Sequence, residues 1–327
     1  MSPRFVVLAF TLVVLALGAP VPGAAQKVTR VGLMSVGSDP ARPEGPQWLA
    51  FLEGLRALGY VEGQNLAVER RFAAGKPEKL TDFAADLVRR KVDVIVVTGT
   101  RETQAAHRAT KTIPIVTTVL SDPVGTGVAT SLARPGGNVT GLTFNAEGVA
   151  GKYVELLREA VPSATRMAVL ASRPQASTVE KEMFDAARSR NVVLQPIALV
   201  KGSEDFDAFF ARARRDGVGG VIVTSDGVTN VNRQQVVDLA ARHRMPTIYP
   251  VREFVDRGGL LAYGPSFVDL FRRAATFVDK IVKGARPGEL PIEQPTRFEL
   301  VVNLKTARAL GLSLSPILLT RADQVLQ

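Results

Sequence analysis

Small polar residues recur in this sequence where short apolar runs end. Hydroxyls, glycines and two aspartates follow successive runs, and two tyrosines close later ones. Hydroxyls and the N–H groups at helix starts bind carboxylates, and an aspartate accepts hydrogen bonds from an amine. A tyrosine adds an apolar wall with a polar tip. The set suits a small zwitterion, and its members are Ser35, Thr98, Gly99, Thr100, Ser121, Asp122, Asn145, Ser172, Ser225, Asp226, Tyr249 and Tyr263.

The same residue types also serve as helix caps that touch no ligand. A Ser, Thr or Asp side chain before a helix accepts a hydrogen bond from an otherwise free backbone N–H. For any single candidate, capping explains the residue as well as binding does. The recurrence of polar groups at the same place in successive units favours a binding site.

Signatures of enzymes are absent from the sequence. It contains neither the G-x-S-x-G elbow nor a phosphate-binding P-loop, and "GVAGKY" around Lys152 has the wrong spacing for one. With no cysteine, disulfides and thiolate metal sites are excluded, and two histidines, His107 and His243, make a histidine-rich metal site improbable. We therefore predict no catalytic residue, no cofactor and no metal.

The glycine-rich stretch from Ser121 to Gly141 needs a separate interpretation. Its "GTGVAT" lacks the third glycine and the acidic partner of a dinucleotide-binding turn. We expect its beginning to form a wall of a binding cleft, and "VGTGVATSLA" to form a short helix. Gly136 and Gly137 are expected in a sharp turn, with backbone angles closed to other residues.

The elements that would position these residues alternate between strand and helix. Apolar runs such as "VDVIVVT" and "IPIVTTV" are separated by amphipathic segments such as "PEKLTDFAADLVRR". This alternation predicts an α/β fold with parallel sheets covered on both faces. In such sheets ligands bind outside the carboxyl ends of the strands, where the candidate residues lie.

After about residue 150 the pattern starts again. "TRVGLMS" is echoed by "TRMAVLAS", "VRRKVDVIVVTGT" by "ARRDGVGGVIVTSDG", and "TIPIV" by "RMPTIYP". We infer two Rossmann-like lobes, at 28–145 and 149–263. A strong amphipathic helix at Ser266–Lys283, a strand "RFELVVN" and a helix "LKTARALGL" follow. These extra elements indicate that the chain crosses back between the lobes.

The N-terminal segment and the charge bear on location and partners. Arg4, a largely apolar run from Phe5 to Leu17 and small residues before Gln26 have the layout of a secretory signal peptide, with cleavage expected after Ala25. An uncleaved anchor is the alternative. The net charge is +10, but basic and acidic residues are mixed, so no nucleic-acid partner is expected. The "NVT" sequon at Asn138 is interpreted as chance.

Several motifs resemble one family. They are "IPIVTTVLSDPVGTGVATSLARPGGNVTG", "GKYVELLREAVP", "REFVDRGGLLAYGP" and "FELVVNLKTARALGL". They are similar to the substrate-binding proteins of bacterial ABC importers, of the tryptophan/tyrosine type. The resemblance implies a type I periplasmic-binding-protein fold, whose two lobes are joined by a hinge of several crossovers. One lobe would comprise 28–145 and about 266–287, the other 149–263 and about 288–327.

The resemblance also implies a function. The chain would be a monomer in the periplasm that closes on a small solute, an amino acid or similar, and delivers it to an ABC permease in the inner membrane. Relatives tend to carry an Asp-Asn pair where this chain has Ser225-Asp226-Gly227, so Asp226 carries over but the amide does not. A ligand-sensing module, an exported two-lobed enzyme and a transcriptional regulator are the alternatives; the regulator would need an N-terminal helix-turn-helix in place of the apolar segment.

Overall fold

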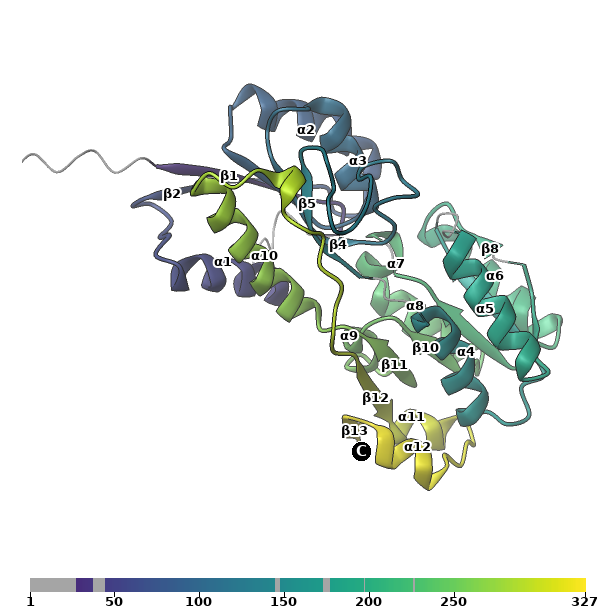
Figure 1. Cartoon of the computed structure of the whole chain (residues 1–327). Coiled ribbons are helices and arrows are strands. Elements are labelled where there is room, and N and C mark those ends of the chain that lie inside the picture. Colours follow the sequence, from purple (N-terminus) through teal and green to yellow (C-terminus); the bar gives the residue numbers. More distant parts are fainter. Residues whose placement is uncertain (1–27, 38–44, 145–147, 173–176, 197, 226) are drawn as a thin grey trace, which may run out of the picture.

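The computed structural model describes residues 28–37, 45–144, 148–172, 177–196, 198–225 and 227–327. It contains two lobes, each a β-sheet with helices on both faces (Figure 1). The first lobe is built on the sheet β2-β1-β3-β4-β5. Its elements are β1 (Thr29–Ser35), α1 (Pro46–Ala57), β2 (Leu66–Phe72), η1 (Pro77–Lys79), α2 (Leu80–Arg89), β3 (Val94–Val97), α3 (Thr100–Ala109), β4 (Ile115–Leu120), β5 (Val139–Thr143) and α10 (Phe267–Val282).

All strand pairs of this first sheet are parallel. Every residue of β3 and β4 is buried, as expected for strands covered on both faces. Val94 and Val96 point to the side of α1 and α10, whereas Ile95 and Val97 pack with α2 and α3. The period-two alternation of the strands therefore divides the lobe into two apolar layers.

The second lobe is built on a larger sheet of order β13-β12-β11-β10-β9-β6-β7, with β8 also paired to β6. Within it, β11 and β12 are antiparallel, which departs from the purely parallel sheet that we predicted. The elements are α4 (Val149–Ala160), β6 (Arg166–Ala171), α5 (Ser177–Ser189), β7 (Val193–Leu194), β8 (Ala198–Leu199), η2 (Ser203–Asp205), α6 (Phe206–Arg215), β9 (Gly220–Val223), α7 (Gly227–Val231), α8 (Arg233–Arg242), β10 (Thr247–Tyr249), α9 (Arg252–Val255), β11 (Leu261–Gly264), β12 (Glu299–Asn303), α11 (Leu304–Ala309), α12 (Pro316–Arg321) and β13 (Gln324–Leu326).

The antiparallel pair follows from the path of the chain. After β11 the chain leaves the second lobe, forms α10 against α1 of the first lobe, and returns. It returns at the end of the sheet from which it left, so that Glu299 pairs with Gly264. Because β12 starts where β11 ends, it must run in the opposite direction.

The strand order repeats between the lobes, as the echoed sequences predicted. The order β2-β1-β3-β4-β5 of the first sheet corresponds to β7-β6-β9-β10-β11 of the second. The echoed segments occupy equivalent strands: β1 and β6, β3 and β9, β4 and β10. The two lobes are thus two copies of one βαβ plan.

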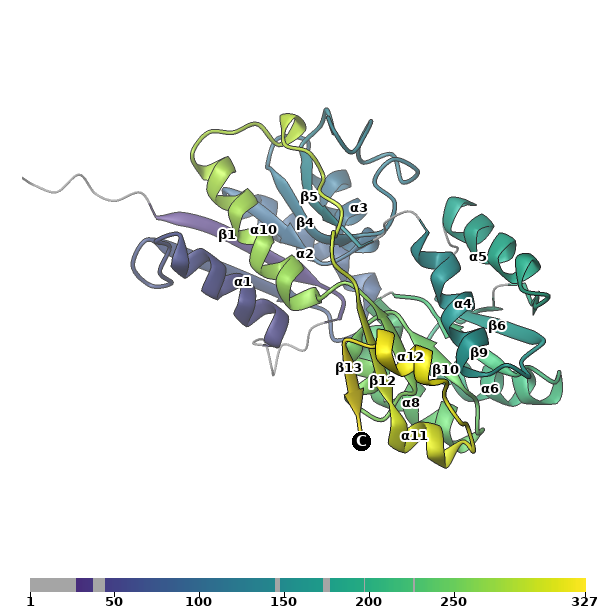
Figure 2. The same ribbon diagram turned by 60° about the horizontal axis from the view of Figure 1, so that its bottom comes forward.

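Three segments connect the lobes, and Figure 2 shows two of them beside α10. They lie between β5 and α4, between β11 and α10, and between η3 (Pro287–Glu289) and β12. Ser266 caps α10 by accepting a hydrogen bond from the N–H of Asp269 at 3.3 Å. Before the last crossing the chain is bonded to the first lobe, since Glu293 donates its N–H to the carbonyl of Gly141 at 2.9 Å.

The stretch from Ser121 to Gly141 differs from our prediction in two respects. "VGTGVATSLA" forms a series of turns and not a helix, because Gly127 has a φ of 72° and Asp122 accepts hydrogen bonds from within its own turn. Gly136, with a φ of 78°, has the left-handed angle that we expected, whereas Gly137 does not. The side chain of Asn138 is buried and bonded to the carbonyls of Thr110 and Ile113, so the sequon is a structural asparagine.

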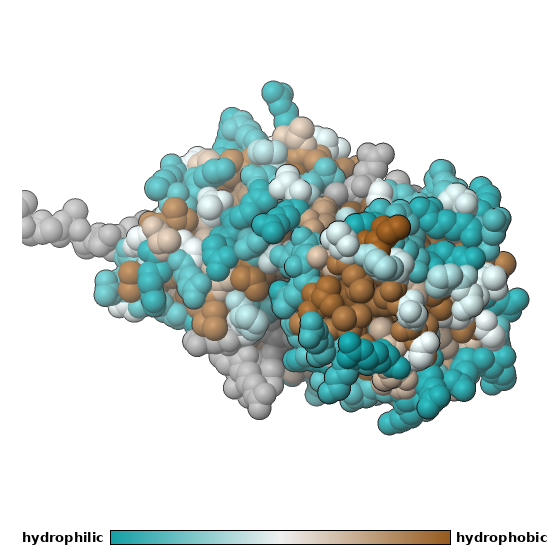
Figure 3. All heavy atoms as spheres, turned by 90° about the horizontal axis from the view of Figure 1, so that it is seen from below, coloured by the Kyte–Doolittle hydropathy of each residue, from teal (hydrophilic) through white to brown (hydrophobic). Residues whose placement is uncertain are grey.

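Apolar side chains gather on the surface of the second lobe when the molecule is seen from below (Figure 3). Helix α12 lies on this side (Figure 2), and its Ile317 is 68% exposed. Among the described residues, no helix is both long enough and apolar enough to cross a membrane.

Candidate functional site

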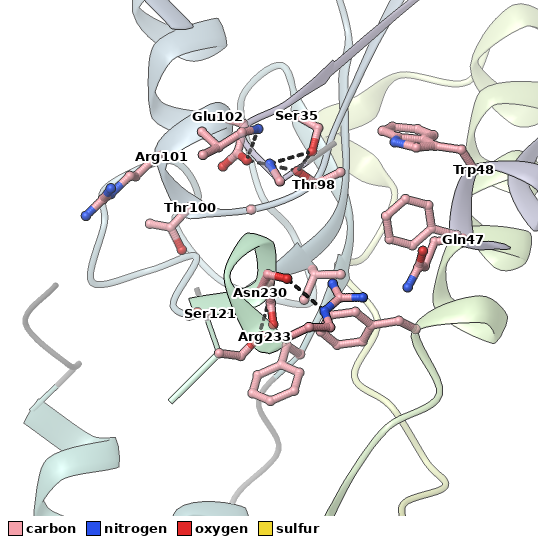
Figure 4. Close-up of a pocket in the computed structure, with 18 residues that line it drawn as sticks. Ser35, Gln47, Trp48, Thr98, Thr100, Arg101, Glu102, Ser121, Asn230 and Arg233 are labelled. Atoms are coloured by element: carbon pink, nitrogen blue, oxygen red, sulfur yellow. Dashed lines mark hydrogen bonds between the residues drawn. The ribbon is translucent and has the colours of Figure 1, made fainter. Parts of the chain in front are cut away.

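A pocket opens where the strands of the two sheets end (Figure 4). The empty space in it is about 840 Å³ with the open mouth included. The first lobe contributes the turns after β1, β3, β4 and β5 together with the starts of α1, α3 and α10. The second lobe contributes residues of the β9–α8 region. The lining residues are Ser35, Val36, Gly37, Gln47, Trp48, Thr98, Gly99, Thr100, Arg101, Glu102, Val119, Ser121, Phe144, Ser225, Asn230, Arg233, Phe267 and Phe271.

The pocket brings together six of the predicted residues, which lie at or just after the ends of strands. They come from both lobes and are Ser35, Thr98, Gly99, Thr100, Ser121 and Ser225. Asn145 and Asp226 lie outside the described residues. The rule that ligands bind at the carboxyl ends of parallel strands therefore located this pocket from sequence.

The other predicted residues lie away from the pocket lining. Asp122 accepts a hydrogen bond from the N–H of Gly125 at 2.8 Å, so its carboxylate is bonded within its own turn. Ser172 lies on the second-lobe side, where its carbonyl accepts a hydrogen bond from Arg101.

Neither tyrosine forms the expected wall. Tyr249 is 1% exposed and stacks on Phe254, with the ring centroids 4.7 Å apart. Tyr263 is half-buried and stacks on Phe298 at 5.6 Å. Both belong to strands and not to the turns beyond them, so their rings pack among the helices and strands of the second lobe. Burial also raises the pKa of the Tyr249 hydroxyl.

The aromatic wall comes instead from the first lobe, where sequence reasoning missed it. Trp48 is 3% exposed, and its ring meets that of Phe271 edge-on at 5.0 Å. Phe144 and Phe267 form a second edge-on pair at 5.8 Å. These residues occupy the apolar faces of α1 and α10 and the end of β5. In a sequence, an apolar helix face that lines a pocket has the same residue pattern as one that packs in a core. The pattern alone therefore does not distinguish the two.

A buried carboxylate organises the hydroxyls at the ends of β1 and β3. Glu102 is 5% exposed and accepts hydrogen bonds from the N–H of Val36 and the hydroxyl of Thr98, both at 2.9 Å. The Thr98 hydroxyl also lies 3.0 Å from that of Ser35. Glu102 stands in the first turn of α3, where a negative charge is favoured. It fixes the first-lobe turns at the pocket.

Two buried polar atoms of the pocket have no hydrogen-bond partner in the described part of the chain. They are the hydroxyl oxygen of Thr100, from the first lobe, and the amide oxygen Oδ1 of Asn230, from the second. Buried polar groups in folded proteins are nearly always paired. Two unpaired atoms that line the same pocket from opposite lobes indicate where a bound molecule would complete the hydrogen bonds.

Arg101 and Gln47 of the first lobe donate hydrogen bonds to the second lobe across the pocket. Arg101 of α3 donates from Nη2 to the carbonyl oxygen of Ser172 at 2.9 Å. Gln47 of α1 donates from Nε2 to Oε1 of Glu253 at 2.9 Å. Rotation of one lobe against the other must break these bonds, so the pocket and the contact between the lobes change together.

The model of the ABC transporter substrate binding protein family matches residues 36–326. The chain belongs to this family. Like other members, it has the type I periplasmic-binding-protein fold, an α/β fold of two lobes. The family consists of proteins that bind substrates without converting them.

Individual relatives of this substrate-binding protein agree with that result. A tyrosine-binding protein of Clostridioides difficile is 25% identical over 289 residues, covering 88% of this chain and 82% of the relative. A conserved domain protein of Vibrio cholerae is 27% identical with a TM-score of 0.84, over 91% of this chain and 100% of that one. A protein of Streptococcus pneumonia in complex with L-Trp is 23% identical, also with a TM-score of 0.84, over 92% and 100% of the two chains.

The described residues contain no group of three or more His, Asp and Glu side chains that could hold a metal ion. The charged groups at the pocket are those of Arg101, Glu102 and Arg233. This substrate-binding protein thus presents to its pocket hydroxyls, two amides, a carboxylate, guanidinium groups and aromatic rings. Such a set binds a small organic molecule by hydrogen bonds and apolar contact.

Proposed function

We propose that this chain is the solute-binding component of an ABC importer and traps an amino acid between its lobes by hinge closure. The observation that carries the proposal is the composition of the pocket from both lobes. Because Thr100 and Asn230 lie on opposite lobes, both can bond to one solute only in the closed state. Binding energy then stabilises closure.

An amino acid is the solute class that the pocket and the relatives support. One relative is named a tyrosine-binding protein, and another was solved with L-Trp bound. The wall of Trp48, Phe267 and Phe271 would take an apolar or aromatic side chain. The hydroxyl and amide groups would take the polar end. Asp226 remains our candidate for accepting hydrogen bonds from the ammonium group.

For the hinge, we propose the division 28–145 with 266–287, and 149–263 with 288–327. The hydrogen bonds at 288–293 suggest one adjustment to it. Gly288 and Glu293 are bonded to Gly136 and Gly141 of the first lobe. The last crossing would accordingly lie at residues 294–298.

The proposal extends to location and partners. The chain would be exported by the segment at 1–25, cleaved after Ala25, and would act in the periplasm as a monomer. It would deliver its solute to an ABC permease in the inner membrane and carry out no reaction. Intact mass after expression with export tests the cleavage, and light scattering tests the oligomeric state.

The decisive experiment is a binding screen with two readouts. A panel of amino acids, sugars and carboxylates is tested for a rise in melting temperature, and each hit is tested by small-angle X-ray scattering. We expect at least one amino acid to raise the melting temperature and reduce the radius of gyration. Native mass spectrometry of the purified protein would reveal a solute carried through purification. Turnover of a substrate, with no solute producing both changes, would overturn the proposal.

A further inference from the structure

Arg233, the first residue of α8, places its guanidinium group at the second-lobe side of the pocket (Figure 4). Its Nε donates to the carbonyl oxygen of Asn230 at 2.7 Å, which fixes the plane of the guanidinium group. No carboxylate among the described residues lies within 4.0 Å of it. The two Nη groups have no hydrogen-bond partner in that part of the chain.

Two neighbouring charges act on this guanidinium from beyond ion-pair distance. Glu253 attracts it; Oε1 of that carboxylate accepts a hydrogen bond from Gln47, and its Oε2 is buried with no hydrogen-bond partner among the described residues. Arg257 repels it. Burial lowers the pKa of Arg233, yet a guanidinium remains charged in proteins. A partly buried cation in this position is stabilised by an anion that enters the pocket.

Asn230, three residues before Arg233, supplies a hydrogen-bond acceptor beside the donors of the guanidinium group. Its Oδ1 is buried and lacks a donor, while its Nδ2 lies 3.4 Å from the hydroxyl of Ser225. On the second-lobe side of the pocket, two neighbouring polar groups therefore lack hydrogen-bond partners. The Arg233 fork matches the two oxygens of a carboxylate, and the Asn230 oxygen needs an N–H.

We propose that Arg233 binds the carboxylate of the solute and that Asn230 accepts a hydrogen bond from the neighbouring amino group. This assignment rests on the proposed function. It specifies which side chains bind the carboxylate and the amino group of an α-amino acid. The second lobe would orient the backbone of the amino acid, and the aromatic wall of the first lobe would hold its side chain. Arg101 is left for the contact between the lobes, since it donates to Ser172.

The test pairs two variants with three probes that differ in one polar group each. L-tryptophan carries both groups, indole-3-propionate lacks the amino group, and tryptamine lacks the carboxylate. Affinities are measured by isothermal titration calorimetry on the full chain. Arg233→Gln should weaken L-tryptophan and indole-3-propionate by about 10- to 100-fold, the range for hydrogen bonds to charged groups. It should leave tryptamine unchanged.

Asn230→Ala should show the reverse selectivity. It should weaken L-tryptophan and tryptamine by about 3- to 30-fold and leave indole-3-propionate unchanged. Arg233→Lys keeps the charge without the fork and should fall between wild type and Arg233→Gln. Arg242→Gln, in the same helix with a 69% exposed side chain, is the matched control and should bind as wild type does.

The outcomes separate this inference from the proposed function. If Arg233→Gln weakens all three probes equally, the inference is wrong while solute binding stands. Equal binding of L-tryptophan by wild type and Arg233→Gln would also overturn it. If wild type binds nothing in the full panel, the proposed function itself fails. Melting temperatures show whether each variant is folded.

Discussion

The two lobes share a strand order but meet the pocket with different chemistry. The first lobe contributes the rings of Trp48 and Phe271 and hydroxyls held by Glu102. The second contributes the amide of Asn230 and the guanidinium of Arg233. A duplicated βαβ plan therefore provides two equivalent edges, and the residues placed on each edge divide the work. The first lobe offers most of the apolar surface together with hydroxyls, and the second offers an amide and a guanidinium group.

The largest expected effect comes from removing the aromatic wall. Trp48→Ala should lower the free energy of unfolding by about 3–5 kcal/mol, because the ring packs on Phe51, Phe72 and Phe271. It should also weaken solute binding in the molecules that remain folded. Urea denaturation followed by circular dichroism gives the first value, and calorimetry gives the second.

Tyr249→Ala is the matched change in the second lobe. Its ring is equally buried, so a comparable loss of stability is expected, but it does not line the pocket. Affinity should therefore stay near the wild-type value. An equal loss of affinity in both variants would contradict the division between the lobes.

The second test uses two glycines at equivalent strands, Gly141 in β5 and Gly264 in β11. A Cβ at Gly141 would lie 2.1 Å from the carbonyl oxygen of Thr117, and one at Gly264 would lie 1.8 Å from that of Pro250. Each substitution to Ala should cost about 2 kcal/mol or more. Gly141→Ala should cost more, because its φ of 126° is also strained for Ala. Thermal unfolding measures both effects.

Gly137→Ala serves as the control for these glycines. Nothing lies within 4 Å of a Cβ at this position, and its φ is not positive. Its melting temperature should match that of wild type. If Gly141→Ala and Gly264→Ala also leave the melting temperature unchanged, the close approach of each glycine to a neighbouring backbone carbonyl is wrong.

The third test compares two aspartates that the sequence presents alike. Asp226→Ala, in the second lobe, should weaken solute binding by more than about 1 kcal/mol, because it removes an acceptor for the ammonium group. Asp122→Ala, in the first lobe, should leave affinity unchanged, since Asp122 is bonded within its own turn. Calorimetry with L-tryptophan checks both, and unchanged affinity in Asp226→Ala would remove that residue from the site.

The smallest effect concerns acid stability of the first lobe. Arg71 and Arg90 lower the pKa of Asp86 from 3.8 to about 2. A lowered folded-state pKa contributes stability above about pH 4, which is lost as the pH falls toward 2. Asp86→Asn should therefore reduce the difference in melting temperature between about pH 6 and about pH 3. Asp82→Asn, on the same helix, is the control, and an equal reduction there would contradict the assignment to Asp86.

The sequence predicted the strand ends well because a parallel α/β sheet places its loops at a known edge. Ser35, Thr98 and Ser225 were found in this way. Asn230 and Arg233 were missed because they lie beyond Asp226, in the short helix α7 and at the start of α8, where no strand end points to them. Trp48 was missed because its position on α1 has the pattern of an ordinary core residue. Tyr249 was misplaced because a residue inside a strand packs within its own lobe.

The order of elements along the chain has a consequence for how the protein folds. Helix α10, which covers α1, is made only after the strands β6 to β11 of the other lobe, and β12 follows later still. Neither lobe can therefore be completed until synthesis of the chain is nearly finished. The apolar face of α1 stays uncovered until about the last sixth of the sequence has been made. Long-range contacts of this kind slow folding. For a chain that we propose to be exported, slow folding prolongs the unfolded state in which a polypeptide can pass through a membrane channel.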